Sequence, residues 1–403
     1  MPKLSDYEPI VGKVVIDELA NLAGLLKGKR IQNINSTAVG GGVAEILNRM
    51  VPLLQELGVD AKWDVIKGGE DFFNVTKAIH NALHGAPVDI TEAMWKAFWE
   101  TGDKNNQDLK CDADIVFVHD PQPIKLVDQK RDNKWLWRCH VDVSIADPNV
   151  WDVLKQYIVK YDSAVFSAPS FSKPLPIRQF LISPSIDPLS DKNRELSEEE
   201  IEKVLDHYEL RRNKPIVTQI SRFDRLKDPL GVIAAYRNVK KYNDCQLVLA
   251  GGTAVDDPES VAVLAEVQNE ARSDKDIHVI LMAQNDIHIN ALQRASDVIV
   301  QKSLKEGFGL TVTEALWKSK PVVASAVGGI PLQVKHKFHG LLCHSPEGAA
   351  FAIKQLLQNP EFAQQLAANG REHVKQNFLL TRHLKEYMLL FLSLFHTDDI
   401  VNL

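Results

Sequence analysis

The sequence predicts an α/β protein with two domains, each a mostly parallel sheet between layers of helices. Three observations support this fold class. The chain has 403 residues, enough for two or three domains of ordinary size. Runs of apolar and β-branched residues alternate with helical patterns, an order that produces parallel sheets covered on both faces. A proline- and serine-containing segment with the composition of a linker, residues 183–190, separates two such series.

The first series opens with a helical pattern at residues 15–23 and a basic hinge at residues 25–30. The strands predicted beyond this hinge cover residues 31–35, 61–66, 115–118, 135–141, 164–167 and 180–182. The helical patterns between them cover residues 43–57, 72–83 and 91–99. The first domain is therefore expected to occupy residues 1–183.

The second series repeats this architecture without repeating the sequence. It begins with a charged helix at residues 197–208 and ends in a helical tail at residues 361–395. The strands predicted between them cover residues 216–220, 246–250, 277–281, 297–300, 321–324 and 341–343. Two sheets of this kind facing one another would form a deep cleft.

Composition excludes several classes of function. A net charge of −6 argues against a nucleic-acid partner, because affinity for phosphate backbones comes mainly from clustered Lys and Arg. Neither a signal-peptide pattern nor a run of eighteen apolar residues occurs, so we expect a cytoplasmic protein with no membrane partner. The four cysteines are far apart and predict neither a zinc site nor disulfides.

A strand, a glycine turn and the start of a helix occur together at residues 297–318. The first turn of a helix has backbone N–H groups without partners, so an anionic ligand can bind there, and Gly307 and Gly309 allow it to come close. Glu306 and Glu314 could bind separate hydroxyl groups of one ligand. The alternative for Glu314 is structural, because Thr311-x-x-Glu314 also fits a capping box.

A second polar loop, residues 221–228, follows the first strand of the second domain, where open α/β sheets place ligand-binding loops. Arg222 and Lys227 are spaced so that both could bind one diphosphate. The alternative is a solvated loop in which these cations pair with Asp224 and Asp228.

Two further motifs lie in the first domain. Residues 40–42, Gly-Gly-Gly, precede a helix and could admit a phosphate or a sugar hydroxyl, although such turns are common. Residues 119–123, His-Asp-Pro-Gln-Pro, follow a buried strand and form a stiff polar loop, although a histidine in this position is often only a hydrogen-bonded core residue. Residues 112–114, Asp-Ala-Asp, match a metal-binding pattern but precede the strand, so we expect no metal site.

The stretch Glu-Gly-Phe-Gly-Leu-Thr-Val-Thr-Glu, residues 306–314, resembles the Glu-x7-Glu signature of retaining glycosyltransferases of family 4, which have the two-domain GT-B fold. The 221–228 loop is similar to the phosphate-binding loop of that family. Residues 119–123 and 135–142 resemble trehalose-forming glycosyltransferases that use a nucleoside diphosphate glucose, and also retaining trehalose phosphorylases. The similarity extends through residues 35–45, 72–77, 80–83 and 184–189.

This resemblance implies a GT-B protein with an acceptor-side domain (residues 1–183), a donor-binding domain (residues 184–375) and a last segment (residues 376–403) that crosses back to the first domain. It also implies roles for individual residues. Those expected to be catalytic are Arg222, Lys227 and Glu306. Those expected to bind the donor nucleotide sugar are Gly41, Gly42, Arg222, Lys227, Asn285, Gly307, Phe308, Gly309, Leu310, Thr311 and Glu314. Those expected to bind glucose are His119, Asp120, Gln122, Arg138, His140 and Asp142.

The activity that the resemblance implies is reversible, retaining synthesis of α,α-trehalose from a nucleoside diphosphate glucose and glucose, without a tightly bound cofactor. Three alternatives stay open at this point: a trehalose phosphorylase using inorganic phosphate, a nicotinamide-dependent oxidoreductase, and a non-catalytic sugar-nucleotide sensor. The oxidoreductase is disfavoured because the G-x-G-x-x-G fingerprint is missing. The sequence leaves open the preferred base, the physiological direction, stimulation by Mg²⁺ and a homodimer.

Overall fold

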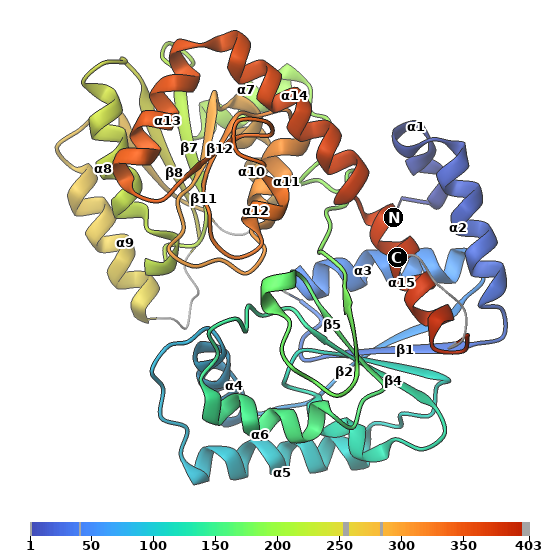
Figure 1. The fold of residues 1–403 in the computed structure, drawn as a ribbon. Helices are drawn as coiled ribbons and strands as arrows, with labels where there is room; N and C mark the ends of the chain where they lie inside the picture. Colours follow the sequence, from blue (N-terminus) through green and yellow to red (C-terminus); the bar gives the residue numbers. More distant parts are fainter. Residues whose placement is uncertain (1, 40–41, 253–257, 283–284, 397–403) are drawn as a thin grey trace. The chain divides into compact units, whose positions relative to one another are not determined.

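The computed structural model describes residues 2–39, 42–252, 258–282 and 285–396. The chain forms two compact units (Figure 1). The N-terminal unit contains Met1–Ser185 together with Leu380–Leu403, and the C-terminal unit contains Ile186–Leu379. Each unit holds a six-stranded sheet in which all neighbouring strands pair in parallel. The predicted α/β class with two parallel sheets is therefore confirmed.

The sheet of the N-terminal unit has the strand order β2-β1-β3-β4-β5-β6. The strands are β1 (Arg30–Asn35), β2 (Asp60–Val65), β3 (Ile115–His119), β4 (Lys134–Cys139), β5 (Ser163–Phe166) and β6 (Arg178–Leu181). The order changes direction between β1 and β3, so the loops that follow these strands border a topological switch point, where open α/β sheets bind ligands.

Helices cover both faces of this sheet. They are α1 (Glu8–Val11), α2 (Lys13–Leu25), α3 (Gly42–Glu56), α4 (Glu70–Leu83), α5 (Glu92–Asp108), α6 (Pro148–Ile158) and α15 (Leu380–Ser393), with short 3-10 helices at Leu4–Tyr7, Ile124–Gln129 and Pro169–Phe171. α4, α5 and α6 lie on one face, and α2, α3 and α15 lie on the other (Figure 1).

The alternation of β3 explains why both faces need a cover. Val116 and Val118 belong to the apolar cluster shared with α4, α5 and α6. Phe117 points to the opposite face, where its ring centroid lies 5.0 Å from that of Tyr387 and 5.8 Å from that of Phe391, both on α15. The last helix of the chain is therefore part of the core of the N-terminal unit.

The sheet of the C-terminal unit has the order β12-β11-β10-β7-β8-β9. Its strands are β7 (Ile216–Ile220), β8 (Gln246–Gly251), β9 (Ile277–Leu281), β10 (Val298–Gln301), β11 (Val322–Ser325) and β12 (Leu341–Cys343). Its helices are α7 (Glu198–His207), α8 (Pro229–Lys240), α9 (Pro258–Ala271), α10 (Asp286–Ala295), α11 (Leu310–Trp317), α12 (Ile330–Gln333), α13 (Pro346–Gln358) and α14 (Pro360–Asn377), with a 3-10 turn at Arg225–Lys227. All six strands lie within one residue of their predicted positions.

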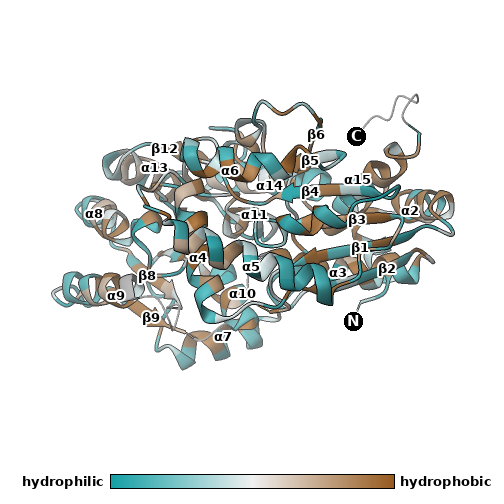
Figure 2. Ribbon diagram, turned by 90° about the horizontal axis from the view of Figure 1, so that it is seen from below, coloured by the Kyte–Doolittle hydropathy of each residue, from teal (hydrophilic) through white to brown (hydrophobic). Residues whose placement is uncertain are grey.

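Two apolar clusters lie on opposite faces of this second sheet. Leu247 and Leu249 of β8 pack with α8, α9 and α13, whereas Val248 and Ala250 pack with α7 and α10. Figure 2 shows both hydrophobic and hydrophilic residues on covering helices such as α4, α8 and α9, as expected when one side of a helix faces a sheet. Among the described residues, no helix is long and apolar enough to cross a membrane.

Three helical predictions needed correction. The helix predicted at residues 91–99 continues to Asp108. The prediction ended too early because the second half of the helix is polar and lacks an apolar stripe. α6 was not predicted. The tail predicted as one helical region is two helices, because Ile186 donates its backbone N–H to Phe378 O at 2.9 Å and pairs with Leu379. This extended pairing ends α14 where the chain passes from the C-terminal to the N-terminal unit.

The end of β8 gives a test of this packing. A Cβ atom at Gly251 would lie 1.8 Å from the backbone oxygen of Ser221. Gly251→Ala is therefore expected to lower the free energy of unfolding of the C-terminal unit by about 1–3 kcal/mol, the usual penalty of overpacking. Gly24→Ala in α2 is the control, since no atom lies within 4 Å of its added methyl group. Urea unfolding checks both variants. A Gly251→Ala midpoint equal to that of the wild type would contradict the packing at the end of β8.

Candidate active site

The loops after β7 and β10 meet at the switch point of the second sheet. β10 pairs with β7 in register Val298↔Val217, and the chain continues from β7 to β8 on the other side. The carboxyl ends of parallel strands lie at one edge, so this pairing brings the 221–228 loop beside the 302–309 loop. Leu304 donates its backbone N–H to Leu226 O at 2.7 Å, which joins the two loops.

Lys227 and Glu306 form an ion pair between these loops. Lys227 Nζ lies 2.7 Å from Glu306 Oε1 and 2.8 Å from Oε2. Glu306 Oε2 also accepts hydrogen bonds from Gln301 Nε2 at 3.2 Å and Ser303 Oγ at 3.0 Å. The side chains of Lys227 and Glu306 are only 18% and 9% exposed. The structure thus brings together two of the three residues predicted to be catalytic.

The other charged residues of the 221–228 loop have different partners. Arg222 is 61% exposed on its side chain and lies 3.3 Å from Asp224 Oδ2, as the solvated-loop alternative expected for it. Asp228 contacts Lys302 Nζ and accepts the backbone N–H of Gly231 at 3.1 Å, which caps α8. Lys227 is therefore directed to Glu306 and not to Asp228.

The turn before α11 is built on glycine. Gly309 is the N-cap with φ 81° and ψ 57°, a left-handed conformation that favours glycine. Thr311 lies inside the helix, and no side chain caps it, so the capping-box interpretation of Glu314 is wrong. Glu314 is 7% exposed and accepts a hydrogen bond from Gln293 Nε2 at 3.4 Å. At the start of α11 the N–H of Val312 bonds Gly309 O at 2.9 Å, so the N–H groups that precede it, such as that of Leu310, are the ones an anion could use.

A second glycine turn, which was not predicted from the sequence, supports the first. Gly328 and Gly329 lie between β11 and α12, and a Cβ at Gly328 would lie 1.8 Å from Glu306 O. Gly329 donates its N–H to Gly307 O at 2.7 Å, and Gln333 Nε2 donates to Phe308 O. A glycine pair four residues beyond the end of the predicted strand at residues 321–324 was the available signal.

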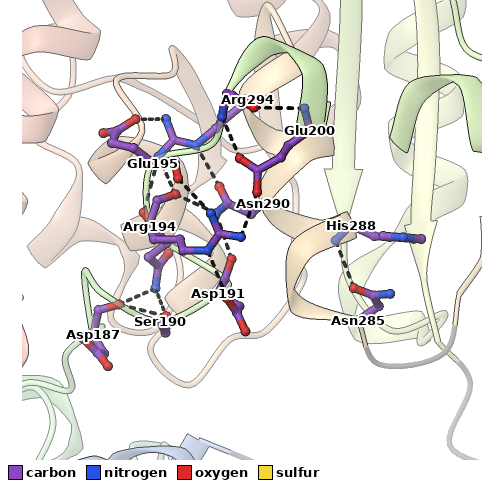
Figure 3. Close-up of polar contacts among 12 residues, drawn as sticks. Asp187, Ser190, Asp191, Arg194, Glu195, Glu200, Asn285, His288, Asn290 and Arg294 are labelled. Carbon is purple, nitrogen blue, oxygen red and sulfur yellow. Dashed lines mark hydrogen bonds and ion pairs between the residues drawn. The ribbon is translucent and has the colours of Figure 1, made fainter. Parts of the chain in front are cut away.

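α10 connects the start of this unit with α11. Asn285 caps its N-terminus by accepting the backbone N–H of His288 at 3.2 Å (Figure 3). Asn290 Nδ2 donates to Asp191 O and Arg194 O, both at 2.8 Å (Figure 3). Residue 284, next to the predicted donor-binding residue Asn285, lies outside the described residues.

A buried lysine follows Glu314 by one helical turn. Lys318 is 4% exposed, and its Nζ donates to Asn193 Oδ1 at 2.9 Å and to Glu314 O at 3.3 Å. Burial lowers the pKa of Lys318 to about 7, although the negative charge of Glu314 opposes this shift. α11 therefore carries a carboxylate and an amine in a poorly solvated environment.

In the N-terminal unit, pairing of β3 with β4 brings the two predicted acceptor stretches together. Asp120, with φ 66°, donates its N–H to Arg138 O at 2.7 Å, and its Oδ1 accepts the backbone N–H of His140 at 2.8 Å. Trp137 Nε1 donates to Asp120 O at 3.1 Å. Burial raises the pKa of Asp120 to about 6, opposed by the His140 N–H and by the charge of Arg138.

The predicted acceptor residues differ in exposure. Asp120, Gln122, His140 and Asp142 are half-buried, whereas His119 and Arg138 are 1% and 0% exposed. Both ring nitrogens of His119 are occupied, one by His140 and one by Asn33. Arg138 was predicted to touch glucose, but its guanidinium faces the protein interior, so this position supports an indirect role.

The remaining predictions concern the glycine turn and metals. Gly42 is the first residue of α3, while Gly40 and Gly41 lie outside the described residues. Within the described part of the chain, no group of three or more His, Cys, Asp or Glu could hold a metal ion. The four cysteines are buried free thiols.

Comparisons with known proteins indicate the family of the chain. Residues 33–173 match a family model described as "Trehalose synthase, N-terminal domain", and residues 200–373 match "Glycosyl transferases group 1". The chain is 41% identical to a trehalose synthase from Pyrococcus horikoshii over 97% of its length and 96% of the relative. It is 43% identical to a trehalose synthase from Rubrobacter xylanophilus over 97% of each protein.

A solved structure shares the fold at low sequence identity. It is the sucrose-phosphate synthase from Thermosynechococcus elongatus, with a TM-score of 0.72 and 19% identity, covering 92% of this chain and all of that one. The predicted GT-B fold is therefore confirmed.

The buried lysine predicts a pH dependence of stability. The pKa of Lys318 is about 7 in the folded unit, against an ordinary value of 10.5. Between these values the unfolded chain binds more protons, so the free energy of unfolding rises with pH, by up to about 1.4 kcal/mol per pH unit. Lys318→Met should remove this rise between pH 7 and 10, while Lys375→Met, an exposed lysine on α14, should keep it. Urea titrations at several pH values give the free energy of unfolding of each protein. If this free energy depends on pH in the same way in the wild type and both variants, the lowered pKa of Lys318 is contradicted.

Proposed function

Because this chain belongs to the trehalose synthase family of glycosyltransferases, we propose that it transfers glucose from a nucleoside diphosphate glucose to the anomeric hydroxyl of free glucose. The product would be α,α-trehalose, and the reaction would run in both directions. The observation that carries the proposal is the buried Lys227–Glu306 pair at the switch point of the second sheet, beside the N-terminus of α11. In this proposal, Lys227 is the cation that binds the diphosphate and Glu306 the carboxylate that binds the sugar.

The leaving diphosphate gains negative charge as the bond to glucose breaks. Lys227 supplies a mobile point charge, and the exposed Arg222 supplies a planar fork that is free to leave Asp224 for phosphate oxygens. The backbone N–H groups at Gly309 and Leu310 add the positive end of α11. One aligned donor of this kind is typically worth about 3–4 kcal/mol in a transition state.

Glu306 is better suited to hold the donor sugar than to attack it. Its carboxylate already accepts hydrogen bonds from Lys227, Gln301 and Ser303, which lowers its nucleophilicity. A double displacement needs a free carboxylate close to the anomeric carbon. We therefore favour front-face attack with retention, in which an oxygen of the leaving phosphate takes the proton of the acceptor hydroxyl.

The acceptor glucose would bind at the carboxyl ends of β3 and β4. The half-buried groups there, Asp120, Gln122 and Asp142, offer acceptors and donors for sugar hydroxyls. His140 was also predicted to bind glucose, but its ring nitrogens are bonded to Arg138 and His119, so its role would be to support these groups. Glu314 would bind the ribose, with Asn285 near the base. The reaction would need no resident cofactor, because protein cations neutralise the diphosphate; whether Mg²⁺ stimulates it is a matter for the assay.

The direct test is reversal. Purified protein is incubated with trehalose and, separately, ADP, UDP, GDP or inorganic phosphate, and released glucose is measured with the sugar nucleotide or glucose phosphate formed. We expect glucose release with one or more nucleotides. Release with phosphate alone would establish a phosphorylase, and no release in any reaction would overturn the proposed trehalose chemistry.

Lys227→Met should reduce turnover about 10²–10³-fold, the loss typical of a removed transition-state donor. It also leaves Glu306 buried and unpaired, which destabilises the protein. The double variant Lys227→Met with Glu306→Gln removes that charge, so its melting temperature should recover while turnover stays low. Lys241→Met, an exposed lysine after α8, is the control. Normal turnover in the double variant would exclude the phosphate role.

A further inference from the structure

A line of buried and half-buried polar side chains crosses the N-terminal unit next to the proposed acceptor site. Arg138 Nε lies 3.4 Å from His140 Nδ1, His140 Nε2 lies 3.1 Å from His119 Nδ1, and His119 Nε2 lies 3.2 Å from Asn33 Oδ1. Three strands, β4, β3 and β1, contribute to this line. Its members come from the ends of neighbouring strands at the switch point of the first sheet.

The chemistry of these groups allows one arrangement of hydrogens. Burial and the positive charge of Arg138 lower the pKa of His119 to about 3 and that of His140 well below its ordinary value, so both rings are neutral at neutral pH. A neutral imidazole has one N–H, and a guanidinium only donates. His140 must then accept at Nδ1 and donate from Nε2 to His119. His119 in turn donates from Nε2 to Asn33 Oδ1.

Arg138 is held in place from two directions. Its Nη2 donates to Ile182 O at 2.8 Å, and its guanidinium lies 5.4 Å from the ring centroid of Tyr387 on α15. The ring of Tyr387 packs edge-on against His383 at 4.4 Å, and His383 Nδ1 lies 2.9 Å from Ser185 Oγ.

The neighbouring residue of α15 binds the same segment. Arg382 Nη2 donates to Ser183 O at 3.0 Å and to Pro184 O at 3.1 Å, while its Nη1 pairs with Glu386. α15 therefore contacts Arg138 through Tyr387, and it binds residues 183–185 through Arg382 and His383.

We propose that Arg138, held by Tyr387 and His383 of α15, is a positioning residue that fixes one tautomer of His140 and His119 and so orients Asp120 toward a sugar hydroxyl. Both ring nitrogens of each histidine are occupied, so neither imidazole exchanges a proton with the substrate. Asp120, whose Oδ1 is tied to the His140 backbone, then remains as the ionisable group presented at the end of β3. This inference rests on the proposed function, because it assigns the acceptor to this edge.

The charges around the two rings decide the effect of removing Arg138. The titratable or charged groups of this region are Asp120 on the loop after β3, Arg138 on β4, and Arg382, His383, Glu386 and Tyr387 on α15. Loss of the Arg138 charge would raise the pKa of His119 and His140, because that charge disfavours their protonated forms. It would also free His140 Nδ1 to carry the proton.

Neutron diffraction of the wild-type protein at pH 7 tests the tautomers without a substitution. We expect deuterium at Nε2 and none at Nδ1 of both His119 and His140. Deuterium at Nδ1 of either ring, or at both nitrogens of one ring, would overturn the inference whatever the activity of the enzyme.

Kinetics of variants test the positioning role. Arg138→Met and Tyr387→Leu should raise KM for glucose at least tenfold and leave KM for the nucleotide sugar within twofold. Lys385→Met is the control, since Lys385 lies on the same helix and pairs with Glu18.

The possible results distinguish failure of the positioning role from failure of the proposed function. If the wild type transfers glucose but both variants keep their KM for glucose, the positioning role is wrong. A rise in both KM values together with a lower melting temperature in both variants would point to a structural role for Arg138. Arg138→Lys, which retains the charge, separates the two roles: we expect it to restore the melting temperature but not KM for glucose, and recovery of both would make Arg138 merely structural. A wild type that never uses glucose would refute the proposed function, while the neutron result would still judge the tautomers.

Discussion

The parallel direction of all strands is the constraint on which the candidate site depends. Every strand in a sheet ends at the same edge, so loops that are far apart in sequence become neighbours there. In the C-terminal unit, β7 and β10 are adjacent although 77 residues separate Ile220 from Val298, and their loops carry Lys227 and Glu306. The same rule brings Asp120 and His140 together in the N-terminal unit. Sheet order, more than loop sequence, selects which polar residues meet.

The C-terminal unit also contains buried ion pairs. Lys227 and Lys302 each pair with a carboxylate, Glu306 and Asp228, in positions with little solvent. Removal of one partner from such a pair typically destabilises a protein by about 3–5 kcal/mol, because it leaves an uncompensated charge. Both lysines are therefore paired in the protein alone. In the proposed reaction, a cation already in place would reduce the reorganisation needed when the diphosphate gains charge.

In the N-terminal unit, the helix α15 packs against the sheet whose edge is proposed to bind the acceptor. α15 buries Phe391 and Tyr387 against Phe117, so its place is secured by apolar contact. The polar side of the same helix meets Arg138 and the 182–185 segment. Stability and the proposed orientation of the acceptor residues thus depend on one element, and substitutions that loosen α15 are expected to affect both.

Local sequence determined much of this protein. Strong apolar periodicity located all twelve strands, and the spacing of Glu306 and Glu314 with the resemblance it carries indicated a glycosyltransferase. Features that depend on contacts between distant parts of the chain could not be predicted from the sequence. The break between α14 and α15 exists because Ile186 pairs with Leu379, and Thr311 is no cap because the Gly307–Gly309 turn rests on Gly329. Burial of Arg138 and its contact with Tyr387 join residues that share no local pattern. Periodicity reports the environment of a residue relative to its own element, whereas these contacts are set by the packing of elements that lie far apart in the chain.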